Sequence, residues 1–312
     1  MKVKLHKPDL KITFSCLVII FFCSYGVKGQ FLSPEDTINK NRLVLATSIT
    51  TVGYSASIIA LNEMWYKDYP KSGFHFYNDN SSWLQIDKAG HALTSYQLGR
   101  YGYEVLRWTG MEEKPSIWIG GNMGLLFLTG VEILDGFSKE WGFSYGDFIS
   151  NAGGTALFIG QQLAWGEQRA SLKFSYSPSQ YAQLRPETLG NGGLESVLKD
   201  YNGQTIWLSV NPSSFLAERE RTFLPWLNVA IGYGGDGMLG GDSNPIANSD
   251  GEILPDINPY RQYYLSLDLD LTRIRTDSHF LKTLFSVVGF LKIPAPALEF
   301  SEGTLKWHWL HY

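Results

Sequence analysis

The chain has 312 residues, a formal net charge of −4 and 18% charged residues, fewer than the quarter that is usual in soluble domains. It is long enough to bury a core as one large domain or as two ordinary ones. Because no run of basic residues occurs, we expect no nucleic-acid partner. Aromatic residues reach 14%, which suits either a membrane interface or an aromatic-rich soluble core.

The first 29 residues have the pattern of a secretory signal peptide. A basic start, MKVKLHKPDLK, precedes the apolar run ITFSCLVIIFFCSYG, and VKGQ offers cleavage after Gly29. The apolar run, at about 15 residues, is shorter than the roughly 20 of a spanning helix. We therefore expect export to the cell envelope rather than a retained anchor.

Cysteine usage narrows the chemistry of the mature protein. Cys16 and Cys23, the only cysteines, both lie in the expected signal peptide. Cleavage would leave no disulfide, no thiol nucleophile and no cysteine-based zinc site. Cys23 follows IIFF, which lacks the small residues that a lipoprotein acylation site needs, so we do not expect acylation.

Residues 30–168 have helical periodicity and predict a helical bundle of about four helices joined by short connections. The first and third apolar stretches suit either a membrane-embedded or a buried helix. Gly120 and Gly124, in the third, permit close helix approach. The expected helices cover residues 42–66, 87–108, 116–136 and 144–165.

Residues 169–312 change to strand-like alternation, and the whole chain is therefore expected to be of the α+β class. In QYYLSLDLDLTR (262–273), the odd-numbered residues from Tyr263 are apolar and point one way, whereas the even-numbered ones are mostly polar. A long loop is expected over 236–259 and a short helix over 280–292. Five to seven strands are too few to close a membrane barrel comfortably, so we expect a β-rich unit packed on the helices. Strands are expected near residues 171–177, 204–210, 226–234, 262–273 and 304–312.

Polar residues stand near the ends of the expected helices. They are Asp87, Lys88, His91, Glu132, Asp135, Ser144, Asp147 and Asn151. Within each helix they recur three or four positions apart, so they share a face and could converge in one pocket. Such a pocket would suit a divalent metal or proton transfer. No cofactor is required and no metal is assigned; if one binds, its expected ligands are Asp87, His91 and Glu132.

Each residue also has a plainer structural explanation. Asp87 could cap its helix, and His91 could be a hydrogen-bonded core residue. Asp147 is explained by helix-start chemistry alone. Glu132 ends an apolar run, where an unpaired carboxylate is costly. We therefore expect Lys88 or His91 to be its partner.

Two stretches, DKAGHALTSY and GVEILDGFSKEWGFSYGDFISNAGG, resemble the YfiM-like family of uncharacterised predicted periplasmic lipoproteins and, more distantly, VanZ-like envelope proteins. The shared pattern falls on the polar residues above and on Gly154, and the match covers roughly residues 83–165. This resemblance implies an envelope location and a helical core, but no established reaction. The missing acylation motif departs from the family. The extension after residue 169 looks like a longer Gram-negative variant of Bacteroidetes type.

Three functions remain open from the sequence. The first is a membrane-associated binding or scaffold role built on a buried Asp/His/Glu/Asn network. The second is a membrane-associated hydrolase of lipid or cell-wall precursors, although no GxSxG, phosphate-binding loop or HExxH motif occurs. The third is a structural subunit of an outer-membrane assembly.

The three hypotheses imply the same cellular location and the same type of partner. We expect the protein at the periplasmic face of a membrane, the outer rather than the inner one. Its expected partners are membrane or envelope proteins. The sequence decides neither whether it is an enzyme nor its oligomeric state.

Overall fold

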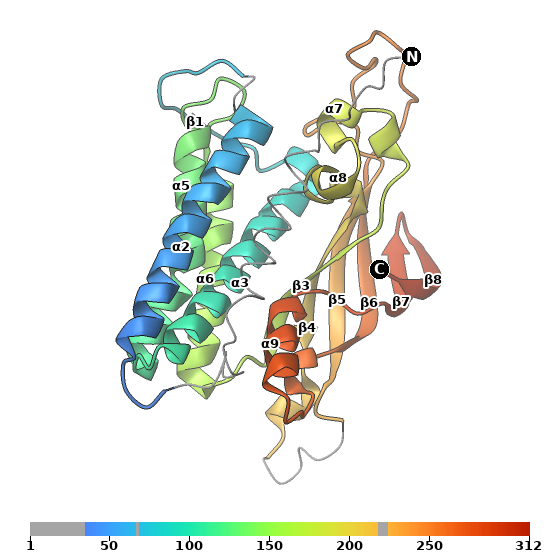
Figure 1. Cartoon of the computed structure of the whole chain (residues 1–312). Coiled ribbons are helices and arrows are strands. Elements are labelled where there is room, and N and C mark those ends of the chain that lie inside the picture. The colour runs from blue at the N-terminus through green and yellow to red at the C-terminus, as the bar shows by residue number, and fades with distance from the viewer. Residues whose placement is uncertain (1–34, 67–68, 218–223) are drawn as a thin grey trace, which may run out of the picture.

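The computed structural model describes residues 35–66, 69–217 and 224–312. A helical part is followed by an antiparallel sheet (Figure 1), which confirms the mixed helical and strand composition. The expected signal peptide and both cysteines lie outside the described residues. The helices are α2 (Lys40–Leu61), α3 (Ile86–Trp108), α4 (Glu113–Pro115), α5 (Met123–Asp135), α6 (Tyr145–Trp165), α7 (Pro186–Leu189), α8 (Gly193–Lys199) and α9 (His279–Val288). The strands are β1 (Phe76–Tyr77), β2 (Phe143–Ser144), β3 (Ala170–Tyr176), β4 (Gln204–Val210), β5 (Leu227–Asp236), β6 (Tyr260–Leu269), β7 (Ala295–Ser301) and β8 (Thr304–His311).

Helix α3 is the centre of the helical part, with α5 and α6 packed on one side and the sheet on the other (Figure 1). The core between these helices contains Tyr96, Ile117 and Phe158. Small residues let the backbones meet: a Cβ atom on Gly154 of α6 would lie 2.0 Å from the carbonyl oxygen of Ala92 in α3. A π-helical turn, Ser116–Gly120, precedes α5, and both lie in one helical stretch, Glu113–Asp135, which matches the predicted helix 116–136 to within a few residues.

The expected four-helix bundle is not confirmed, because α2 is packed much less than the other three. Ala46 is its one buried residue, and the helix stands at the outer side of the helical part (Figure 1). By length and composition alone, α2 and the stretch Glu113–Asp135 could cross a membrane. A third of the second stretch is buried inside the protein, against 6% of the first.

The second half forms a six-stranded antiparallel sheet in which each strand pairs with the next along the chain, from β3 to β8. The strand β7 was missed from the sequence. It contains Pro296 and has an irregular register between Ala295 and Ala297, and a proline lowers the strand signal of its neighbours. Four shorter predictions, near 171–177, 204–210, 226–234 and 304–312, each match an observed strand to within a few residues.

The two faces of the sheet have opposite chemistry. One face carries an apolar residue at the same level in all six strands, and we call it the apolar face. The members of this cross-strand row are Leu172, Leu208, Ile231, Leu265, Leu298 and Trp307. The helical core covers this face at Leu172, whereas Ile231 is 57% exposed and Leu265 is 50% exposed.

The other face, which we call the polar face, is buried although it carries charges. Lys173 Nζ lies 2.7 Å from Asp268 Oδ2, and both residues are 1% exposed. On this face Lys292 Nζ lies 4.8 Å from the centre of the Trp207 ring, and His311 meets the same ring edge to face at 5.7 Å. Antiparallel sheets commonly bury the apolar face and expose the polar one. Here the exposed part of the sheet is apolar and the buried part is polar.

Neighbouring glycines in α6 provide a test of the helix packing. Gly154→Ala places a methyl group against the backbone of α3, and we expect a loss of about 1–3 kcal/mol in unfolding free energy. Gly153→Ala is the matched control, because nothing lies within 4 Å of its added Cβ, and it should stabilise by up to about 1 kcal/mol. Denaturant titration measures both, and equal effects would contradict the packing.

Candidate functional site

The predicted polar residues gather at one end of the helical part. The start of α3, the end of α5 and the start of α6 meet there, next to the loop that precedes α3. The short parallel pair β1 and β2 joins this loop to the start of α6 through Phe76↔Phe143 and Tyr77↔Ser144. The helix ends therefore meet, which the spacing of their polar residues allowed.

Lys88 is the hub of this group. Its ammonium Nζ lies 2.7 Å from Asp79 Oδ2, 3.3 Å from Asp87 Oδ2 and 3.1 Å from Asp147 Oδ1. These carboxylates belong to the preceding loop, to α3 and to α6. Lys88 is 8% exposed, so its charge is shielded from water and the three ion pairs are screened little.

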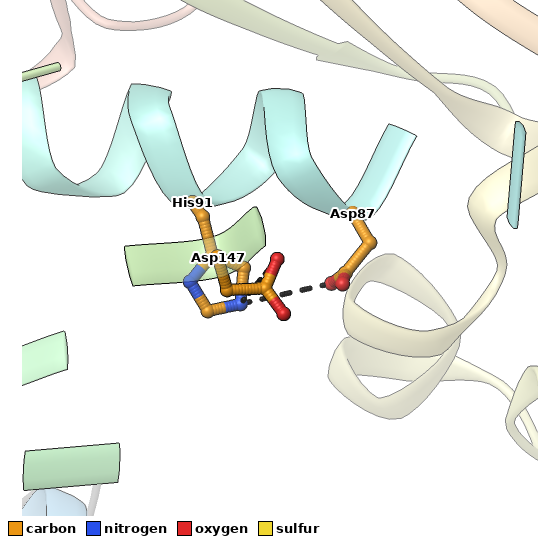
Figure 2. Close-up of side chains that lie close together, drawn as sticks. All are labelled: Asp87, His91 and Asp147. Carbon is orange, nitrogen blue, oxygen red and sulfur yellow. Dashed lines mark ion pairs between the residues drawn. The ribbon is translucent and has the colours of Figure 1, made fainter. Parts of the chain in front are cut away.

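His91 lies one helical turn further along α3. Its Nδ1 is 3.1 Å from Asn151 Oδ1 and 3.8 Å from Glu132 Oε1. On the other side of the ring, Nε2 faces Asp87 Oδ1 at 3.8 Å and Asp147 Oδ1 at 4.0 Å (Figure 2). The imidazole therefore has one acid and one amide beside Nδ1 and two acids beside Nε2, and Glu132 lies next to the histidine that was expected as one of its two possible partners.

Ser144 fixes the start of α6 and connects two acids to it. Its Oγ accepts a hydrogen bond from the Asp147 N–H at 3.1 Å, as an N-cap does. The same hydroxyl donates to Asp79 Oδ1 at 2.5 Å. The backbone N–H of Ser144 donates to Glu132 Oε2 at 3.1 Å, which joins the end of α5 to the start of α6.

Asp87 and Asp135 have partners that sequence reasoning did not identify. Asp87 does not cap α3, because the N-cap position is Gln85; instead its Oδ1 accepts from the Tyr201 hydroxyl at 2.9 Å. Asp135 accepts from the Tyr66 hydroxyl at 2.7 Å. Asp79, like Tyr201 and Tyr66, was not among the predicted site residues. It lies in a loop rich in turn formers, where the sequence does not indicate an ion pair.

Burial and the closeness of like charges raise the pKa values of two acids in the cluster. Burial raises the pKa of Glu132 to about 8. Burial, and then the nearby Asp87 carboxylate, raises the pKa of Asp147 to about 7. Burial lowers the pKa of His91, but the surrounding carboxylates outweigh it and the net shift is upward. Glu132, Asp147 and His91 therefore hold protons more tightly than the same groups would in water.

Asp87, His91 and Asp147 are close enough to share a metal ion, since one potential ligand atom from each lies within 4.8 Å of the others. The set expected from the sequence had Glu132 in place of Asp147. The geometry differs because Glu132 approaches Nδ1 of His91, whereas Asp87 and Asp147 approach Nε2.

The raised pKa of Glu132 predicts a dependence of stability on pH. Its pKa is about 8 in the folded protein, against 4.5 for the free group. Between these two pKa values, folding takes up a proton. The stabilisation is therefore fully present below the pKa of the unfolded state and is lost as pH rises through the pKa of the folded state. Glu132→Gln keeps an acceptor for Ser144 and should reduce the loss of unfolding free energy between about pH 5 and 9. Denaturant titrations across this range measure it, and an unchanged slope would contradict the shift.

The segment that matches a known protein family contains this site and excludes most of the chain. Residues 72–160 match the model of a family described as Predicted periplasmic lipoprotein (DUF2279). The match spans the cluster from Asp79 to Asn151 but less than a third of the chain, and the sheet lies outside it. No curated protein and no solved structure matches the chain. The matched segment thus resembles an uncharacterised family of the cell envelope, which supports export.

Proposed function

We propose that this is a membrane-associated envelope protein with a binding or scaffold role. The observation that carries the proposal is the reversed polarity of the sheet, with charged residues buried and a row of large apolar residues exposed. Exposed apolar patches of this kind mark contacts with membranes or proteins. Acyl chains accept these side chains, whereas water does not.

The apolar face offers a continuous surface for this contact. Beyond the part that the helices cover, each of the strands β5 to β8 carries aliphatic or aromatic side chains on this face. Exposures there range from 39% to 66%. The residues are Val229, Ile231, Tyr263, Leu265, Leu267, Phe300, Leu305 and Trp307.

Helix α2 presents a second apolar surface on the far side of the molecule. Val44, Val52 and Ile59 are each more than 60% exposed. A helix with so little packing gains little stability from the rest of the protein, so a lipid or protein contact on this side would stabilise it.

The charged cluster supports the scaffold part of the proposal. Through Asp87 and Tyr201 it joins α3 to the segment that leads into β4. Through Lys88 it joins α3 to α6 and to the preceding loop. Such a network of ion pairs and hydrogen bonds holds the helices against the segment that leads into the sheet.

The hydrolase alternative has weaker support. Two cavities among the described residues lie away from His91. One, of about 310 Å³, is lined by Tyr66, Tyr69 and Leu134 among others. The other, of about 270 Å³, lies beside Arg100 and Lys173. A hydrolytic site needs substrate space next to its acid and base, and neither of these two cavities is lined by His91, Glu132 or Asp147.

A specific feature favours a second candidate, the structural subunit of an outer-membrane assembly. Within the described part of the chain, β8 pairs with β7 alone, and Trp309 on it is 81% exposed. An open strand edge of this kind can accept a strand from a partner. A photo-crosslinking residue at Trp309 should give one constant product in cells, whereas one at Leu194 should not.

Paired substitutions on the apolar face test membrane association. Ile231 and Leu265 are opposite each other on β5 and β6, so Ile231→Glu with Leu265→Lys places opposite charges across the strands and preserves the pairing. We expect the membrane-bound fraction of this variant to fall at least tenfold, because charged groups on a lipid-facing surface cost about 2–4 kcal/mol.

The matched control changes the same residue types elsewhere. Leu194→Glu with Ile253→Lys alters two exposed positions, 70% and 84% exposed, outside the apolar face. It should leave the membrane-bound fraction unchanged in flotation with vesicles and in cell fractionation. Equal behaviour of the two folded variants would contradict the proposal.

A further inference from the structure

Three side chains from two helices point toward one spot in the charged cluster. Asp87 and His91 project from α3, and Asp147 approaches from α6 (Figure 2). Nε2 of His91 is 3.8 Å from the Asp87 oxygen and 4.0 Å from the Asp147 oxygen. These separations are too long for hydrogen bonds. They are slightly longer than the roughly 3.4 Å between ligand atoms in a tetrahedral site with bonds of about 2.1 Å.

The far side of the imidazole is arranged as in a metal-bound histidine. Nδ1 lies 3.1 Å from Asn151 Oδ1, and Asn151 is fully buried. When Nδ1 donates to this oxygen, the lone pair of Nε2 points at Asp87 and Asp147. A lone pair facing two carboxylates requires a positive charge between them, which either a proton or a metal ion supplies. Metal-binding histidines are commonly oriented by such a hydrogen bond from the other ring nitrogen.

Unsatisfied polar atoms at the same spot are an independent observation. Asp147 is 4% exposed, and its Oδ1 makes no hydrogen bond, although Lys88 Nζ lies 3.1 Å away. The Nδ2 atom of Asn151 also has no hydrogen-bond partner. Buried polar atoms are rarely left without one. The Asp147 oxygen is the one that faces His91 Nε2.

The charges of the cluster leave room for another cation. Four carboxyl groups, those of Asp79, Asp87, Glu132 and Asp147, lie within 4.0 Å of Lys88 Nζ or of a ring nitrogen of His91. Lys88 and His91 are the basic groups that contact them in the structure. Carboxyl groups therefore outnumber the basic groups in contact with them, and a bound divalent ion would add a further positive charge for them to contact.

We propose that Asp87, His91 and Asp147 bind one divalent transition-metal ion, of which Zn²⁺ is the best fit. One imidazole nitrogen and two carboxylate oxygens suit Zn²⁺ or Mn²⁺ better than Ca²⁺ or Mg²⁺, which prefer oxygen ligands alone. Bound there, the ion links the first turns of α3 and α6. The site does not depend on the membrane role, which has a separate readout.

Calorimetric titration of the tag-free, metal-stripped protein with ZnCl₂ and, separately, MnCl₂ tests this site. We expect one Zn²⁺ per chain and a rise in Tm when it binds. His91→Gln and Asp87→Asn should each weaken binding about 100-fold or more. Asn151→Ala, which removes the group that orients the imidazole, should weaken it about 10–100-fold. Zinc X-ray absorption of the wild-type complex should show one imidazole ligand.

His308→Gln is the matched control, since His308 also contacts an acid, Glu299, but lies on β8. It should bind Zn²⁺ as the wild type does. Circular dichroism before titration identifies variants that do not fold. If His91→Gln does not fold, the test rests on Asp87→Asn, which keeps an acceptor for the Tyr201 hydroxyl. Absence of binding to the folded wild type would overturn the proposal. So would binding that His91→Gln and Asp87→Asn leave unchanged, or that His308→Gln weakens equally.

Discussion

The ammonium group of Lys88, shared among three carboxylates, is the interaction on which the arrangement of the helices depends. Asp79, Asp87 and Asp147 come from three separate segments, and each would repel the others without this charge. Removing one member of a buried ion pair costs about 3–5 kcal/mol because the remaining charge is left uncompensated. The hydrogen bond from Tyr201 to Asp87 extends this constraint to the segment before β4.

Charged residues are buried in the sheet as well. Lys173 and Asp268 are paired on the buried polar face, while Ile231 and Leu265 stand exposed on the apolar one. A soluble protein in water would favour the opposite arrangement. The membrane contact proposed above would account for this exposed surface, and the family whose model matches residues 72–160 is described as periplasmic.

Local patterns predicted much of this structure, and long-range contacts explain what they missed. Helical spacing and an apolar run ending in Glu132 indicated that the polar residues of three helices could converge. Tyr201 could not be found, because its contact with Asp87 spans 114 positions and a tyrosine in a turn has no distinctive spacing. The alternation over 262–273 predicted two faces, but burial of the polar one depends on His311 and Lys292, which lie far along the chain.

A double-mutant cycle between Lys88 and Asp147 tests the central role of this ion pair most directly. Lys88→Met, Asp147→Asn and the double variant are compared with the wild type by denaturant unfolding at about pH 8. A shared charge network predicts that Lys88→Met loses about 3–5 kcal/mol and that adding Asp147→Asn restores part of this loss. Strictly additive losses would show that the two side chains act independently, and would contradict the account.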